Sequence, residues 1–186
     1  HTLIMTQGAK DTNYGDIVAR LCPELENTKE GEQVHSKRLP FLRNVITVGF
    51  KQKGCMTWNQ ALEFANKVPI SEVHRMAVQV DKDDVCNMQY TSGTTGFPKG
   101  VMLTHRNIVN NGKTIGDRMD LSTADRMMIQ VPMFHCFGMV LSMTSMMTHG
   151  GTLSPVPYFS PKSSLACINN ERITCFNGVP TMFIAM

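Results

Sequence analysis

The sequence predicts an α/β fold with a mainly parallel sheet. Short apolar runs typical of buried strands alternate along the chain with longer segments that have helical periodicity. A chain of 186 residues with 42% hydrophobic content can also bury one sizeable core. Strands that alternate with helices form right-handed βαβ units, in which neighbouring strands run parallel.

The first half of the chain contains one predicted strand and one predicted helix. Residues 44–50, NVITVGF, form an apolar run rich in β-branched residues, which indicates a buried strand. Residues 57–67, TWNQALEFANK, repeat apolar side chains at helical spacing. Thr57 and Gln60 have the spacing of a capping box at the start of this helix, and Pro69 follows its end.

The second half continues the alternation. Residues 85–91, VCNMQYT, predict a strand, and residues 106–119, RNIVNNGKTIGDRM, predict a helix. Residues 127–133, MMIQVPM, predict another strand. The remaining predicted elements are a helix over 138–149, a short strand over 152–157 that Pro155 interrupts, a helix over 161–172 and a strand over 173–179.

Composition excludes several classes of function. The net charge of +3 comes from 18 basic and 15 acidic residues scattered along the chain, which argues against a nucleic-acid partner. Residues 23–40, PELENTKEGEQVHSKRLP, form a charged segment that is expected to be an exposed excursion. No apolar run approaches the roughly 20 residues that span a bilayer, so no integral membrane segment is expected.

The cysteines and histidines do not have the spacing of a metal site. Six cysteines lie without any CxxC pair, mostly in apolar surroundings, which predicts reduced core thiols in a cytoplasmic protein. The six histidines form neither HxxxH nor HExxH. No metal site built from a direct cluster of side chains is therefore expected.

Residues 91–100, TSGTTGFPKG, gather glycines, hydroxyl residues and a lysine between two apolar runs. We expect this loop to join the strand over 85–91 to the helix over 106–119, where open α/β sheets bind ligands. Glycine lets backbone N–H groups approach an anion, and hydroxyl groups and an ammonium add further donors. The predicted phosphate-binding residues are Thr91, Ser92, Gly93, Thr94, Thr95, Gly96 and Lys99.

This loop differs from two common phosphate-binding motifs. A P-loop requires G-x-x-x-x-G-K-[ST], whereas here Pro98 precedes the lysine and Gly100 follows it. The spacing of Gly93 and Gly96 also does not match the dinucleotide fingerprint. A flexible turn without a ligand is the alternative for a loop of this composition.

Three segments together resemble the adenylate-forming superfamily of acyl-CoA synthetases, luciferases and nonribosomal adenylation domains. Residues 91–100 match its phosphate-loop signature, and residues 132–138, PMFHCFG, resemble its P-[LM]-[FY]-H-x-x-G segment. Residues 176–182, FNGVPTM, are similar to a third signature, usually YGVPTM. The combination looks closest to medium- and long-chain fatty acyl-CoA synthetases. Residues 88–105, MQYTSGTTGFPKGVMLTH, and residues 107–112, NIVNNG, especially resemble the branch called acyl-CoA synthetase family member 2 and its bacterial relatives.

The resemblance implies a fold, a reaction and its substrates. The chain would be part of the large N-terminal domain of an enzyme that joins a fatty acid to AMP from ATP, releases pyrophosphate, and passes the acyl group to coenzyme A. Mg²⁺ would accompany ATP. The partners would be these small molecules, with a possible homodimer.

The resemblance also assigns residues to the acid side of the site. His135 would border the point where carboxylate and AMP meet; the alternative is a histidine that only satisfies the start of a helix. Gly178 and Val179 would lie along the acyl pocket, with Thr181 near the phosphates. Two further residues predicted in the substrate pocket are Phe134 and Met139.

The methionines around Met139 allow two interpretations. Eight of the 15 methionines fall between Met119 and Met147, and several of them repeat at helical spacing. Such a stripe is typical of a plain core. The functional alternative is that pliable thioethers line a tunnel for acyl chains of varied length.

The resemblance covers only part of such an enzyme. The chain begins with His1 and stops inside an apolar segment, so we expect residues 1–186 to be a partial AMP-binding domain, truncated at both ends, without the small C-terminal domain. This fragment alone is expected to be inactive. The alternatives are another ligase of the superfamily, acting on aryl or amino acids, and a truncated non-catalytic nucleotide-binding module.

Overall fold

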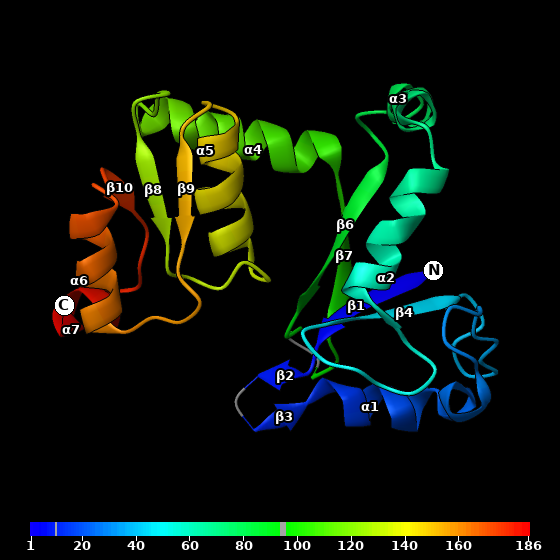
Figure 1. The fold of residues 1–186 in the computed structure, drawn as a ribbon. Helices are drawn as coiled ribbons and strands as arrows, with labels where there is room; N and C mark the ends of the chain where they lie inside the picture. The colour runs from blue at the N-terminus through cyan, green and yellow to red at the C-terminus, as the bar shows by residue number, and fades with distance from the viewer. Residues whose placement is uncertain (10, 94–95) are drawn as a thin grey trace. The chain divides into compact units, whose positions relative to one another are not determined.

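The computed structural model describes residues 1–9, 11–93 and 96–186. The chain divides into two compact units, residues 1–79 and residues 80–186. Both units contain parallel strands connected through helices, which confirms the predicted α/β class (Figure 1).

The first unit is built on a parallel three-stranded sheet. Its strands are β1 (Thr2–Thr6), β4 (Asn44–Val48) and β5 (Met56–Thr57), in the order β1-β4-β5. Strand β4 confirms the strand predicted over 44–50. The other elements are the antiparallel pair β2 (Gly8–Ala9) and β3 (Thr12–Asn13), helix α1 (Tyr14–Leu21), and a 3₁₀ helix (Pro23–Asn27).

The charged segment 23–40 is not simply an exposed excursion, so that prediction is wrong in part. Leu25 and Val34 are 2% and 1% exposed and belong to the core of the first unit. Ser36 is also buried, and the Glu24 carboxylate accepts a hydrogen bond from the Lys37 amide at 3.0 Å. Apolar side chains at intervals anchor the segment while most of its charges face solvent, which a count of charges alone does not reveal.

The helix predicted over 57–67 forms, but it is shorter and is followed by another helix. Helix α2 (Trp58–Glu63) continues as a 3₁₀ helix (Phe64–Lys67), and α3 (Ile70–Val78), which was not predicted, begins directly after Pro69. The Thr57–Gln60 capping box is present in both directions. Pro69 therefore separates two helices.

The second unit contains a parallel sheet in the order β10-β8-β9, as Figure 1 shows. Strand β8 (Arg126–Ile129) is central and almost wholly buried. Strands β9 (Thr152–Pro155) and β10 (Cys175–Phe176) pair with it on either side, and β10 is much shorter than predicted. The helices of this unit are α4 (His105–Arg118), a π-helix (Phe137–Thr144), α5 (Ser145–Met147), α6 (Pro161–Asn170) and α7 (Pro180–Ala185).

The segment after the strand predicted over 85–91 departs from the prediction. Strand β6 (Val85–Thr91) pairs antiparallel with β7 (Lys99–Thr104), so the intervening loop closes a hairpin. A strand-to-helix connection was expected there, and that expectation is wrong. Residues 99–104 pair along β6 before α4 begins, because the glycine-rich turn reverses the chain direction.

The helix predicted over 138–149 is π-helical along most of its length and packs against α4, which it crosses (Figure 1). Its wide turns are stabilised by hydroxyl groups that donate five residues back: Ser142 to the Phe137 carbonyl at 3.3 Å and Thr144 to the Met139 carbonyl at 2.8 Å. A Cβ at Gly112 would lie 2.6 Å from the Thr144 side chain. Glycine in α4 thus permits the close approach of the two helices.

Candidate functional site

The loop after β6 has a backbone that requires glycine. Gly93 and Gly96 have φ angles of +61° and +82°, in the left-handed region. A Cβ at Gly93 would also overlap the Phe97 carbonyl oxygen. The predicted phosphate-binding residues Thr94 and Thr95 lie outside the described residues.

The hairpin register brings Thr91 and Lys99 together. Thr91 pairs directly with Lys99, as Gln89 does with Val101 and Asn87 with Leu103. Opposed residues of an antiparallel pair place their side chains on the same face, and residues two apart along a strand share that face. Thr91 and Lys99 therefore share the hairpin face of Asn87 and Gln89. The loop leads into β7 and not directly into α4. The positive charge at this loop therefore comes from the Lys99 ammonium and not from a helix N-terminus.

The segment 132–138 forms a tight turn that leads into the π-helix. The His135 amide donates to the Pro132 carbonyl at 3.2 Å, and the Gly138 amide donates to the His135 carbonyl at 3.0 Å. Gly138 is buried, and a Cβ there would overlap the Pro132 carbonyl and lie 2.9 Å from the Val131 oxygen. The glycine of this motif is thus explained by its close contact with the backbone of residues 131 and 132.

The imidazole of His135 has a defined tautomer. Its Nδ1 accepts a hydrogen bond from the Phe137 amide at 3.0 Å. A neutral imidazole with Nδ1 as acceptor carries its proton on Nε2. His135 is exposed, so its Nε2–H can donate to a ligand. The histidine thus contributes to the local turn, as one interpretation expected, and its Nε2–H remains available to donate to a ligand.

Side chains of β6 connect the first motif to the second. The Gln89 amide donates to the Phe134 carbonyl at 2.8 Å, and the Asn87 amide contacts the Met139 sulfur at 3.7 Å. Sequence reasoning missed both residues, because their role depends on a contact across more than forty positions. Gln89 thereby joins the hairpin that carries Thr91 and Lys99 to the backbone next to His135.

The third motif meets the same π-helix from another direction. The Asn177 amide donates to Ser142 Oγ at 3.0 Å and to the Leu141 carbonyl at 3.3 Å. The Gln130 amide donates to the Asn177 carbonyl at 3.4 Å, and a Cβ at Gly178 would lie 3.2 Å from its nitrogen. Gln130 and Asn177 were not predicted as site residues, although a glutamine in an apolar strand and the asparagine that replaces tyrosine are visible in the sequence.

The remaining predicted pocket residues lie around these contacts. Val179 is 42% exposed and Thr181 is exposed at the start of α7, which is held back on β10 by stacking of Phe183 on Phe176 with ring centroids 5.5 Å apart. Phe134 is 83% exposed, whereas Met139 is half-buried against Asn87. Met146, from the same methionine stripe, is fully buried in the core of the second unit.

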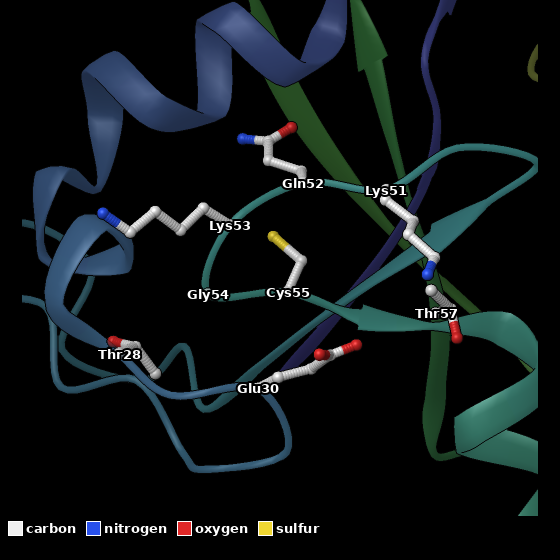
Figure 2. A pocket seen from close by; sticks show the side chains of 8 residues that line it. All are labelled: Thr28, Glu30, Lys51, Gln52, Lys53, Gly54, Cys55 and Thr57. Carbon is white, nitrogen blue, oxygen red and sulfur yellow. The ribbon is translucent and has the colours of Figure 1, made fainter.

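A separate pocket of about 320 Å³ lies in the first unit, and none of the predicted site residues lines it (Figure 2). Lys51, Lys53 and Glu30 surround it, and Lys53 is paired with Glu26 at 2.9 Å. Cys55, also at this pocket, is 3% exposed, and burial raises the pKa of its thiol to about 11. A nucleophilic thiolate is therefore disfavoured there.

Two kinds of feature are absent from the part of the chain that the structure describes. No group of three or more histidine, cysteine, aspartate or glutamate side chains is arranged to hold a metal ion in residues 1–9, 11–93 and 96–186. No helix within those ranges is both long and apolar enough to cross a membrane.

Comparison with known proteins gives matches along almost the whole chain. The family model described as AMP-binding enzyme matches residues 3–186. The chain is 46% identical over 184 residues to YngI of Bacillus subtilis, provisionally named an acyl-CoA synthetase, and covers 33% of that protein. It is 35% identical over 188 residues to the mouse medium-chain acyl-CoA ligase ACSF2, mitochondrial, and covers 30% of it. In both cases 98% of this chain is aligned.

A solved structure supports the fold. The crystal structure of a protein from Rhodopseudomonas palustris, provisionally named a long-chain-fatty-acid CoA ligase, superposes with a TM-score of 0.70 at 17% identity. The match covers 99% of this chain and 39% of the other. Among the curated relatives named above, the chain spans about a third of the length of each protein.

Proposed function

The chain belongs to the AMP-binding enzyme family, and on this premise we propose that it is the central ATP-binding part of a fatty acyl-CoA synthetase. The reaction joins a carboxylate to the α-phosphorus of ATP with release of pyrophosphate, and the thiol of coenzyme A then displaces AMP. The names of YngI and of the mouse ligase support this class of reaction. Residues 1–186 would form part of its AMP-binding domain.

One observation carries the proposal: Thr91 and Lys99 face each other on the side of the hairpin that Gln89 joins to Phe134, next to His135. A triphosphate held by the hairpin loop and a carboxylate held near His135 would thus be neighbours. Positioning two reactants in this way supplies a large part of the catalysis of such transfers.

The phosphate side would act through charge and hydrogen bonding. Lys99 would face the negative charge that develops on the departing pyrophosphate, and Thr91 and Ser92 would donate hydroxyl hydrogens to phosphate oxygens. Backbone N–H groups near Gly93 and Gly96 can approach closely, because both glycines have positive φ. Each hydrogen bond to a charged group contributes about 1.5–3 kcal/mol.

The acid side would depend on His135, with its proton on Nε2 because Nδ1 accepts from Phe137. An Nε2–H donor can orient a carboxylate oxygen for attack without removing its negative charge. Met139, Gly178, Val179 and Phe134 would contact the acyl chain beyond it, with Thr181 toward the phosphates.

Mg²⁺ would fit this site as a companion of the nucleotide. Mg²⁺ prefers oxygen ligands, and beside a nucleotide it is commonly held by phosphates, waters and only one or two protein groups, among which a Ser or Thr hydroxyl can serve. Thr91 and Ser92 offer such oxygens, and the described residues present no carboxylate cluster that would hold the ion by itself. When bound, it would neutralise charge on the phosphates.

The decisive experiment is acid-dependent ATP–pyrophosphate exchange by the full-length protein, with fatty acids of several chain lengths and with aryl and amino acids for comparison. Lys99→Ala should lower exchange by about 100-fold, since it removes a charge that stabilises the transition state. Lys162→Ala, an exposed lysine on α6, is the matched control and should retain full activity. Exchange supported only by aryl or amino acids, or unaffected by Lys99→Ala, would contradict the proposal.

Assembly and location are proposals of the same kind. A homodimer is proposed from the resemblance, and light scattering on the purified protein measures its mass directly. The six free cysteines support a reducing compartment, and we place the protein in the cytoplasm. The mitochondrial location in the name of the mouse ligase is the alternative, which imaging of a tagged protein distinguishes.

A further inference from the structure

Gln89 lies outside the three motifs but makes a polar contact with the second of them. It lies on β6, two residues before Thr91, and its side-chain amide donates to the Phe134 carbonyl at 2.8 Å. The side chain is half-buried, and Val101 lies opposite it across the hairpin. A hydrogen bond of this length to a backbone carbonyl fixes main chain rather than a mobile side-chain end.

The carbonyl that Gln89 holds belongs to the peptide group preceding His135. Phe134 C=O and His135 N–H lie in one rigid plane. The N–H side of this plane donates to the Pro132 carbonyl at 3.2 Å, and the C=O side accepts from Gln89. The peptide that carries His135 is thus held from both sides, once by its own turn and once by the hairpin.

The same strand face carries the phosphate loop. Residues two apart on a strand are separated by about 7 Å on one face, so Thr91 lies roughly that far along β6 from Gln89. Asn87, on the other side of Gln89, contacts the Met139 sulfur at 3.7 Å. The hairpin therefore contacts both ends of the segment 134–139, and His135 lies between the two contacts.

We propose that Gln89 is a positioning residue, which holds His135 in register with the phosphate loop so that the carboxylate and the α-phosphorus meet at the correct separation. This role rests on the function proposed above. Gln89 acts through the Phe134–His135 peptide, so its loss leaves the phosphate donors intact and displaces only the acid side.

The test uses the full-length enzyme and two substitutions. Gln89→Met keeps the length of the side chain and removes the donor. It should lower kcat of ATP–pyrophosphate exchange by about 10- to 100-fold, as expected for a displacement of about 1 Å between reacting groups, with KM for ATP changed less than about 3-fold. Met88→Leu, on the opposite face of β6, is the matched control and should behave as wild type.

Gln89→Glu supplies a readout that a purely structural role would not move. An ionised carboxylate cannot donate to the Phe134 carbonyl, whereas a protonated carboxyl group can. Its exchange rate relative to wild type should therefore rise as pH falls from about 8 toward 5, while the relative rate of Gln89→Met stays flat. Hydrogen–deuterium exchange of the segment 134–139 should increase in Gln89→Met at pH 7.

The results distinguish a failure of the role proposed for Gln89 from a failure of the proposed function. Wild-type kcat in Gln89→Met, or a raised KM for ATP with unchanged kcat, overturns the role of Gln89 and leaves the proposed function standing. A flat relative pH profile for Gln89→Glu overturns it as well. A wild-type enzyme that exchanges pyrophosphate with none of the acids overturns the proposed function and this role with it.

Discussion

At the scale of single residues, the site depends on positions where only one residue type fits the backbone. Gly93 combines a positive φ with a contact to the Phe97 carbonyl, and Gly138 packs against the Pro132 carbonyl. Any side chain at either position would displace the main chain that carries the proposed ligand contacts. The glycines of two motifs are therefore structural requirements of the loops that present Lys99 and His135.

The cysteines allow a prediction at the same scale. Burial, followed by the neighbouring Cys22 thiol, raises the pKa of Cys55 to about 11, while Cys86 is exposed. We expect iodoacetamide at pH 8 to alkylate Cys86 within minutes and to leave Cys55 unmodified in the folded protein, because the thiolate is the reactive form. Mass spectrometry of peptides after timed quenching measures both sites.

The pH dependence of stability follows from the same shift. The unfolded Cys55 thiol ionises near pH 9 and the folded one near pH 11. Below pH 9 both forms are protonated and the folded state keeps this contribution, which is lost as the pH rises from 9 to 11. If Cys55→Ser leaves the loss of stability between pH 9 and 11 unchanged, the raised pKa of Cys55 is contradicted. Rapid labelling of Cys55 in the folded protein would contradict it as well.

At the scale of elements, the π-helix Phe137–Thr144 connects the site to the sheet. Asn177 donates to it from the end of β10, and Asn87 contacts Met139 from β6. Its wide turns match the hydroxyl donors at positions 142 and 144, which reach carbonyls five residues back. A π-helical segment beside a functional motif is a recurring arrangement in enzymes.

Thr144→Val tests this account of the π-helix. Valine keeps the shape of threonine but removes the donor to the Met139 carbonyl, so the free energy of unfolding should fall by about 1 kcal/mol. Thr148→Val removes a similar donor at an exposed position and serves as the control, with a smaller expected effect. Urea unfolding followed by circular dichroism measures both variants, and equal losses would argue against a special role for Thr144.

At the scale of the whole molecule, the residues proposed for the site account for only part of a bound nucleotide. The chain spans about a third of the length of its curated relatives, and the proposal assigns none of its residues to the adenine or the ribose. The contacts argued for residues 91–99 concern the phosphates alone. Binding by a phosphate cradle without a base pocket is weak and falls with salt, because it is mainly electrostatic.

The 186-residue chain alone should therefore bind ATP·Mg²⁺ with a dissociation constant weaker than about 1 mM at physiological ionic strength. Calorimetry measures this value, and inorganic pyrophosphate with Mg²⁺ is the informative comparison, since it offers phosphates without a base. Micromolar binding of ATP by this chain would show that residues 1–186 contact the base as well.

Local signals in the sequence were sufficient for features that depend on residues three or four positions apart. The capping box of Thr57 and Gln60 is present as predicted, and the helices over 106–119 and 161–172 form close to their predicted bounds. The alternation of strands and helices also determined the α/β class and the parallel sheets. These features follow from periodicity and from backbone preferences of single residues.

Only the tertiary structure decided that residues 99–104 return along β6, that Thr91 therefore faces Lys99, and that Gln89 reaches Phe134. It also decided that the charged segment 23–40 anchors Leu25 and Val34 in a core. The physical reason is the distance along the chain between the residues that make each contact. The sequence by itself determined which groups are available to hold a phosphate, because that is a property of residue types, whereas the separation of those groups in space depends on pairings between distant segments of the chain.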